Sequence, residues 1–208
     1  MKVAIIDYGM GNLGSVRRAI AEIGGSPILV EKPKQLASAE RMILPGVGSF
    51  GDGISDLRRL GWADEIHRQV NELGKPLLGI CLGMQLLADR GLEGGEFQGL
   101  SLIPGEVVRL DTAGCGLRIP HVGWNSITLT GSPSRLFDGI PDDTDFYFVH
   151  SYAFRAVNQA DILAYTEYGI PLAAAISHRH VFGTQFHPEK SSRAGLRLLQ
   201  NFIEYKAC

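Results

Sequence analysis

The sequence has few cysteines and no long apolar run. Its three cysteines include no Cys-x-x-Cys pair and no cluster with histidine at zinc spacing, so neither a disulfide framework nor a bound metal is expected. The N-terminal apolar stretch Val3–Ile6 ends at Asp7, short of the roughly 7–15 residues of a secretory signal. No run approaches the ~20 residues that span a bilayer. These absences predict a protein of the reducing cytoplasm.

The sequence also lacks an excess of charge of either sign. Twenty basic and 22 acidic residues give a formal net charge of −2, and no block of like charge stands out. A nucleic-acid-binding or membrane-surface protein would need a basic face, so neither kind of partner is expected.

The first half of the chain alternates short apolar runs with stretches of helical spacing. This alternation predicts an open, mostly parallel sheet with helices on both faces, in which active sites gather at the carboxyl ends of the strands. Strands are expected at Val3–Tyr8, Ile28–Val30, Met42–Leu44 and Pro76–Ile80, with helices following Asn12, over Ile54–Leu73 and from Leu82.

The second half has more strand character and adds a smaller antiparallel β portion. With no linker or repeat in view, residues 1–208 are interpreted as one domain. Strands are expected at Val107–Leu110, Trp124–Leu129, Asp145–His150, Ala173–Ser177 and Val181–Phe186, and a final helix at Ser191–Tyr205.

The strongest local signal is Gly79-Ile80-Cys81-Leu82-Gly83, between an apolar strand and an apolar helix. This is a nucleophile elbow, with cysteine where hydrolases of another fold carry serine. A strained turn there would leave no room for a Cβ on either side. It would place Cys81 at a helix N-terminus, which favours the thiolate. The alternative is a small buried cysteine in a tight turn.

A cysteine nucleophile needs a base, and His187 is the best candidate among six histidines. It ends the run Val181–Phe186, and Glu189 lies two residues further on, where a carboxylate could orient the imidazole. Taken alone, His-Pro-Glu would also suit a surface turn.

A glycine-rich segment, PGVGSFG at 45–51, follows the strand Met42–Leu44. Such a segment lets backbone N–H groups converge on an anion. A phosphate-binding loop is the alternative, but no lysine follows at the required spacing. Near a nucleophile, an oxyanion hole is the better interpretation.

Taken together, GICLGMQLL at 79–87, QFHPEKS at 185–191 and PGVGSFG resemble the motifs of the class I glutamine amidotransferases, in the family's order. The resemblance implies that glutamine is hydrolysed through a cysteinyl thioester, with Cys81, His187 and Glu189 as the triad and no cofactor. It also implies an oxyanion hole and a glutamine-binding set. The implied oxyanion residues are Gly46, Val47, Gly48 and Leu82, and the implied substrate contacts are Gly48, Gln85, His150, Ser151 and Tyr152.

Four further stretches resemble one branch of this family, whose members pass ammonia to a cyclase subunit. They are DYGMGNLGSV at 7–16, IPHVGWN at 119–125, YFVHSY at 147–152, and Lys190. Val122 stands where the branch usually has methionine. A glutaminase serving another synthase, such as the anthranilate one, and an inactive interaction subunit remain alternatives. The cyclase is expected to contact Asn12, Pro120, Val122, Trp124, Tyr147 and Lys190.

Overall fold

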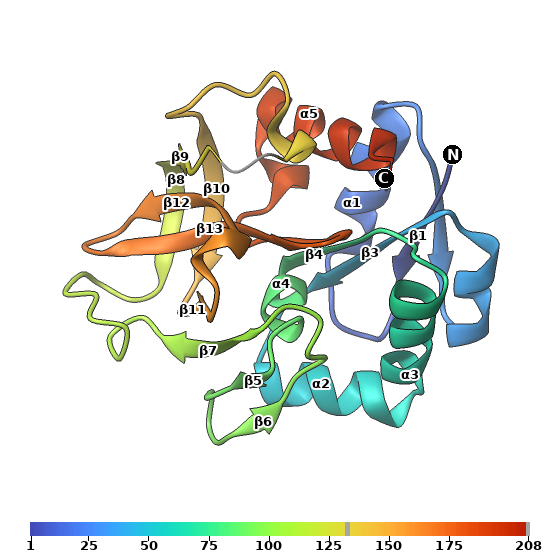
Figure 1. The fold of residues 1–208 in the computed structure, drawn as a ribbon, viewed down its shortest axis with the longest axis horizontal. Helices are drawn as coiled ribbons and strands as arrows, with labels where there is room; N and C mark the ends of the chain where they lie inside the picture. Colours follow the sequence, from blue (N-terminus) through green and yellow to red (C-terminus); the bar gives the residue numbers. More distant parts are fainter. Residues whose placement is uncertain (132–133, 207–208) are drawn as a thin grey trace.

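The computed structural model describes residues 1–131 and 134–206, so Cys208 lies outside the described residues. An eight-stranded sheet runs through the centre of the molecule (Figure 1). Its first five strands are joined in parallel and its last three antiparallel. In spatial order these are β2 (Ser26–Val30), β1 (Lys2–Ile6), β3 (Arg41–Gly46), β4 (Leu77–Cys81), β14 (Val181–Thr184), β13 (Pro171–His178), β12 (Ile162–Glu167) and β9 (Thr128–Leu129).

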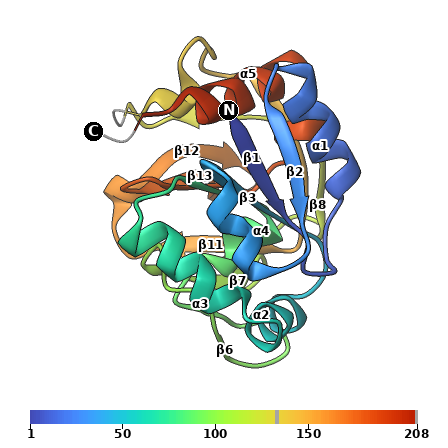
Figure 2. The same cartoon turned by 90° about the vertical axis from the view of Figure 1, so that its right-hand side faces the viewer.

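Helices cover both faces of this sheet (Figure 2). The helices α1 (Leu13–Glu22) and α5 (Ser192–Glu204) lie on one face, and α2 (Phe50–Arg59), α3 (Trp62–His67) and α4 (Leu82–Leu86) lie on the other. Alternate residues of β1 enter the two cores: Ile5 packs with α1 and α5, whereas Ile6 packs with α2 and α3. A strand buried on both faces needs apolar residues throughout, which explains the unbroken apolar runs.

Two smaller sheets complete the fold. The antiparallel pair β8 (His121–Ser126) and β10 (Asp145–His150) forms one of them. The other contains β11 (Tyr152–Ala156), β7 (Gly105–Arg109), β5 (Arg90–Gly91) and β6 (Phe97–Gln98). The predicted fold class, a mostly parallel α/β sheet with a smaller antiparallel portion, is confirmed.

The structure differs from the expected elements in three respects. The single helix expected over Ile54–Leu73 is interrupted at Gly61, whose φ of 77° ends α2 in the left-handed conformation. Strands β5, β6, β11 and β12 were not predicted, and the strand expected at Trp124–Leu129 is divided between β8 and β9. β11 was missed because it follows β10 with no glycine or proline between them. The remaining helical turns are a π-helical turn at Arg68–Glu72 and 3₁₀ turns at Pro33–Ser38, Arg135–Phe137, Gln159–Asp161 and Pro188–Lys190.

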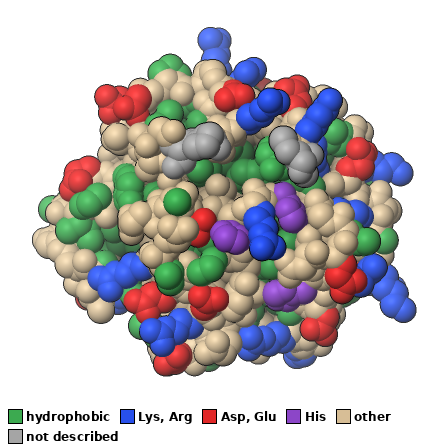
Figure 3. Space-filling model, in the orientation of Figure 1, with side chains coloured by type: hydrophobic (Ala, Val, Ile, Leu, Met, Phe, Trp, Pro, Cys, Tyr) green, Lys and Arg blue, Asp and Glu red, His purple; other side chains and the backbone are tan. Residues whose placement is uncertain are grey.

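The surface agrees with the even charge balance of the sequence. Acidic and basic side chains are interspersed on the face shown in Figure 3. Within residues 1–131 and 134–206, no helix has the length and hydropathy needed to cross a membrane.

Candidate active site

The nucleophile elbow forms where β4 passes into α4. Cys81 is the last residue of β4 and has φ 55° and ψ −112°, a strained conformation for a residue with a side chain. A Cβ on Gly79 would lie 2.5 Å from the carbonyl oxygen of Gly83, and a Cβ on Gly83 would lie 1.8 Å from that of Leu44. Both obstacles are backbone atoms, so neither glycine can be replaced without moving the sheet. The prediction that both flanking positions exclude a side chain is confirmed.

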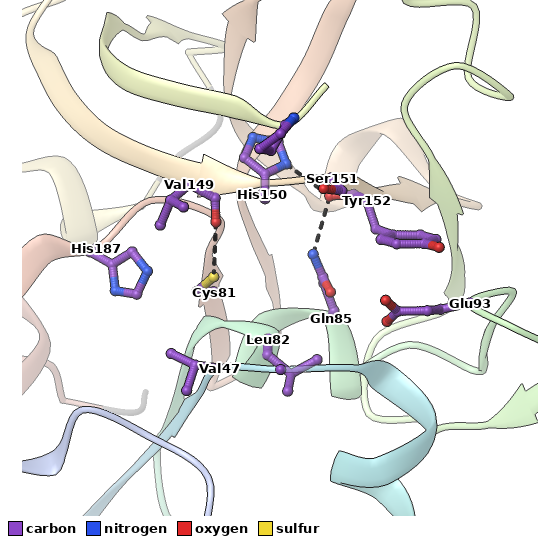
Figure 4. Close-up of a pocket in the computed structure, with 12 residues that line it drawn as sticks. Val47, Cys81, Leu82, Gln85, Glu93, Val149, His150, Ser151, Tyr152 and His187 are labelled. Carbon is purple, nitrogen blue, oxygen red and sulfur yellow. Dashed lines mark hydrogen bonds between the residues drawn. The ribbon is translucent and has the colours of Figure 1, made fainter. Parts of the chain in front are cut away.

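The sheet brings His187 to the same edge as Cys81. Strand β14 pairs in parallel with β4, with Thr184 opposite Ile80, so the segments that follow the two strands leave the sheet at adjacent carboxyl ends. The His187 N–H donates to the Tyr147 carbonyl at 2.9 Å, which fixes the turn against β10. In Figure 4 the imidazole faces the Cys81 sulfur across the cavity.

The His187 ring is oriented by Glu189. Its Nδ1 lies 2.7 Å from Glu189 Oε1, and both side chains are almost fully buried. A carboxylate only accepts, so Nδ1 carries the hydrogen and Nε2 is left to face the thiol. Nε2 is buried without a hydrogen-bond partner among the described residues. Nε2 is therefore the ring nitrogen available to exchange a proton with the reacting groups.

Electrostatics favour a protonated imidazole at rest. Burial lowers the pKa of His187, but its neighbours Cys81 and Glu189 outweigh burial and raise that pKa from 6.5 to about 9. At neutral pH the ring is therefore an imidazolium that can stabilise a thiolate and give a proton to a leaving group.

Cys81 and His187 line a cavity of about 320 Å³ (Figure 4). The Cys81 thiol points at its wall and donates to the Val149 carbonyl at 3.8 Å. Gln85 lies one helical turn beyond the nucleophile, and its Nε2 donates to the Tyr152 carbonyl at 3.1 Å. Ser151 also lines the cavity. Both ring nitrogens of His150 face protein groups, so its contact with a ligand would come from the backbone.

Three of the four oxyanion candidates, Val47, Gly48 and Leu82, line the same cavity. Gly46 is the β3 partner of Cys81, and Val47 and Gly48 follow it along the cavity wall. Gly48 has a φ of 110°, which a side chain would strain. Leu82 opens α4, so its N–H has no acceptor within the helix. Residues of two segments thus lie beside Cys81, and their backbone N–H groups are the candidates for an oxyanion hole.

Two residues of the site escaped the sequence analysis. Glu93 is the only acidic residue among the described residues that line the cavity, and its Oε2 accepts from the Phe50 N–H at 2.6 Å. Gln185 donates to the Cys81 sulfur at 3.8 Å and accepts from Gln85 at 3.0 Å. Gln185 stands two residues before His187, a position that could have drawn attention. Glu93 sits in a glycine-rich loop with no comparable signal.

The predicted partner residues gather mainly on one surface. Val122 and Trp124 of β8 are 55% and 56% exposed, and Trp124 pairs with Tyr147 of β10. The Lys190 ammonium lies 5.8 Å from the Tyr147 ring centre. Pro120 is exposed at the rim of the cavity. Asn12 is exposed on another segment, where its side chain caps α1 through the Ser15 N–H.

Comparison with known proteins places the chain in a family. The sequence model of the glutamine amidotransferase class-I family matches residues 4–205. An imidazole glycerol phosphate synthase subunit HisH from Moorella thermoacetica is 48% identical over 97% of this chain and 94% of its own length. A subunit of the same name from Bacillus velezensis is 44% identical over 99% and 97%.

Solved structures agree on the fold. The crystal structure of a glutamine amidotransferase superposes with a TM-score of 0.75 at 22% identity, over 97% of each chain. A chain of PurLQS from Thermotoga maritima gives a TM-score of 0.77 at 19% identity, over 98% of each. The chain therefore belongs to the class-I glutamine amidotransferase family, within the group of the imidazole glycerol phosphate synthase HisH subunits.

Proposed function

We propose that this chain is the glutaminase subunit of an imidazole glycerol phosphate synthase, with Cys81, His187 and Glu189 as its triad. The observation that carries the proposal is the pairing of a strained cysteine elbow with a buried His187–Glu189 hydrogen bond at one cavity. Residues 1–208 act as one amidotransferase domain in the cytoplasm. The overall synthase reaction belongs to histidine biosynthesis. The anthranilate synthase alternative is not favoured, because the relatives at 44–48% identity carry the HisH name.

The first half-reaction forms a thioester. The Cys81 thiolate attacks the side-chain amide carbon of glutamine, and the carbonyl electrons move onto oxygen. As the C–N bond breaks, His187 Nε2 gives its proton to the departing nitrogen, which leaves as ammonia. The product is a γ-glutamyl thioester, and the imidazole is now neutral.

The second half-reaction releases glutamate. The neutral imidazole takes a proton from water, and the hydroxide attacks the thioester carbon. When the C–S bond breaks, the Cys81 thiolate and the imidazolium of His187 are restored. Glu189 keeps the hydrogen on Nδ1 throughout, so Nε2 always faces the reacting atoms.

Backbone N–H groups stabilise the negative oxygen that forms in both halves. We assign this role to Leu82 and to the segment Gly46, Val47 and Gly48, because they border the thiol. Glutamine brings an α-ammonium and an α-carboxylate into the cavity. Glu93 is suited to the ammonium, and backbone groups of Ser151 and Tyr152 and the Gln85 side chain complete the binding wall.

Ammonia passes to a cyclase subunit that docks on the exposed face of β8 and β10. Trp124, Tyr147 and Val122 present apolar and aromatic surface there, the composition typical of the centre of an interface. With Pro120, Lys190 and Asn12 they form the docking surface of this proposal. The cyclase uses ammonia on a phosphoribulosyl ribonucleotide to form imidazole glycerol phosphate and an aminoimidazole carboxamide ribonucleotide.

The activity is tested by glutamine-dependent synthesis with a co-purified cyclase. Cys81→Ala should abolish synthesis from glutamine and retain synthesis from added ammonium, because only the ammonia source is lost. Cys115→Ser is the matched control: this buried thiol donates to the Tyr168 carbonyl, and Cys115 does not line the cavity. Substantial glutaminase activity in Cys81→Ala would refute the triad.

The docking surface is tested by Lys190→Ala and Trp124→Phe. Both should weaken stimulation of the glutaminase by the cyclase and leave the thermal midpoint nearly unchanged, because both side chains are exposed. Val157→Ala, at an exposed apolar residue outside β8 and β10, is the control. If both variants keep wild-type stimulation, the cyclase docks elsewhere.

A further inference from the structure

Two buried histidines whose rings take no part in the proposed chemistry are hydrogen-bonded to each other: His150 lines the glutamine cavity, and His121 is not among the lining residues. His121 of β8 and His150 of β10 are opposite each other in the strand pair. His121 Nδ1 lies 2.9 Å from His150 Nε2, and both residues are buried. Each ring is neutral, since burial lowers the pKa of His121 to about 4 and that of His150 to about 3.

The hydrogen bonds of this pair run in one direction only. His150 Nδ1 lies 2.8 Å from the Tyr152 carbonyl, which can only accept, so His150 carries its hydrogen on Nδ1 and accepts at Nε2. His121 must then donate from Nδ1 and accept at Nε2. Asn125 meets that requirement, because its Nδ2 lies 3.3 Å from His121 Nε2 and also donates to the Glu167 carbonyl.

The same series of hydrogen bonds continues to Cys81. The Tyr152 carbonyl that accepts from His150 also accepts from Gln85 Nε2 at 3.1 Å. Gln85 donates in turn to Gln185, which contacts the Cys81 sulfur. The Tyr152 carbonyl is therefore held by donors from two sides, and Figure 4 shows it between His150 and Gln85.

The surroundings of His121 allow its packing and its hydrogen bonds to be tested separately. Its ring is stacked between Phe148, at 4.8 Å between centroids, and Tyr168, at 4.1 Å. A phenylalanine at 121 would keep the stack and lose the donor. An asparagine would lose the stack, but its amide nitrogen can occupy the place of Nδ1 and donate to His150.

We propose that His121 is a positioning residue for glutamine: acting through His150, it fixes the Tyr152 carbonyl and the Gln85 side chain that form the binding wall. This inference rests on the proposed function and adds residues to which the triad chemistry assigns no role. Without the His121 donor, His150 Nε2 is a buried acceptor with no hydrogen-bond donor. The His150 ring then reorients, because an unsatisfied buried acceptor is costly. The Tyr152 carbonyl and Gln85 then lose their fixed place.

The test measures KM and kcat for glutamine hydrolysis in the complex with the cyclase. His121→Phe should raise the KM for glutamine about tenfold, the effect of one broken buried hydrogen bond, and change kcat less than about threefold. His121→Asn should return KM to within about threefold of wild type. His178→Phe, outside the cavity lining, is the matched control and should leave KM unchanged.

A second readout compares two reagents that alkylate Cys81. A glutamine analogue carrying a diazoketone should react about tenfold more slowly with His121→Phe at low reagent concentration, whereas iodoacetamide, which needs no binding wall, should react at the wild-type rate. If His121→Phe does not fold, Asn125→Ala takes its place, and should raise KM in the same direction because it frees His121 to change tautomer.

Three outcomes overturn the proposal. One is a wild-type KM in a folded His121→Phe, or in Asn125→Ala where that variant replaces it. Another is a KM for glutamine in His121→Asn as high as in His121→Phe, which would mean that the hydrogen bond from residue 121 to His150 does not set KM. The third is equal slowing of both alkylating reagents. Each is distinct from failure of the proposed function, which would appear as glutaminase activity in Cys81→Ala.

Discussion

Replacing Glu189 by glutamine isolates what the carboxylate does for the base. The pKa of His187 rises from 6.5 to about 9 although burial opposes the rise, so Cys81 and Glu189 together favour the imidazolium. The rise corresponds to at least about 3 kcal/mol. If the two neighbours share it evenly, Glu189→Gln lowers the pKa of His187 by at least about one unit.

Two consequences are measurable. The alkaline limb of the pH–kcat/KM profile reports loss of the imidazolium proton in the free enzyme, so it should lie near pH 9 in the wild type and about one unit lower in Glu189→Gln. Loss of a charge-assisted hydrogen bond should lower kcat at least ~10-fold. The loss should approach ~10⁴ if the new amide turns its NH₂ towards Nδ1 and fixes the other tautomer.

The assay is glutamate release from glutamine in the cyclase complex, between pH 6 and 10. Glu22→Gln, the same substitution at an exposed position on α1, is the control and should match the wild type. If the alkaline limb does not move in Glu189→Gln and kcat falls less than about threefold, Glu189 neither stabilises the imidazolium of His187 nor orients its ring.

Three further outcomes follow from the same geometry. Gly83→Ala places a Cβ 1.8 Å from a backbone oxygen and should lower the free energy of unfolding by ~3 kcal/mol or prevent folding. Gly116→Ala is the control and should leave stability unchanged, because nothing lies within 4 Å of its Cβ position. Equal denaturation midpoints for the two variants would contradict the close approach at Gly83. Gly48→Val should lower kcat by ~10²–10³ with little change in KM, because the strained φ disturbs an oxyanion donor; full activity would make the loop structural. Because the pKa of His187 is raised in the folded state, its protonation stabilises the fold fully below pH 6.5, and this stabilisation is lost as pH rises through about 9. The difference in free energy of unfolding between wild type and His187→Gln should therefore shrink across that range. A difference that stays constant in urea unfolding would refute the assignment.

The elbow could be predicted because its cause is local. A sharp strand–turn–helix connection needs glycine on either side of the central residue. The sequence around Cys81 has glycine at both positions, 79 and 83. His187 and Glu189 are likewise two residues apart, so their hydrogen bond depends on one turn. The interrupted helix at Gly61 was missed although its cause is also local, because the apolar spacing continues through the break.

The sequence by itself determined the strand–helix alternation, and its local patterns predicted Cys81, His187 and Glu189 as a candidate triad. Only the tertiary structure decided which distant segments meet at the cavity. Glu93 arrives from a short loop, Gln185 from the residue after β14 and 100 residues beyond Gln85, and the His121–His150 hydrogen bond from the pairing of β8 with β10. The exposure of Trp124, on the face of β8 opposite His121, is decided in the same way, because strand register sets which face meets the core. Register depends on contacts between segments far apart in the chain, and local spacing carries no record of them.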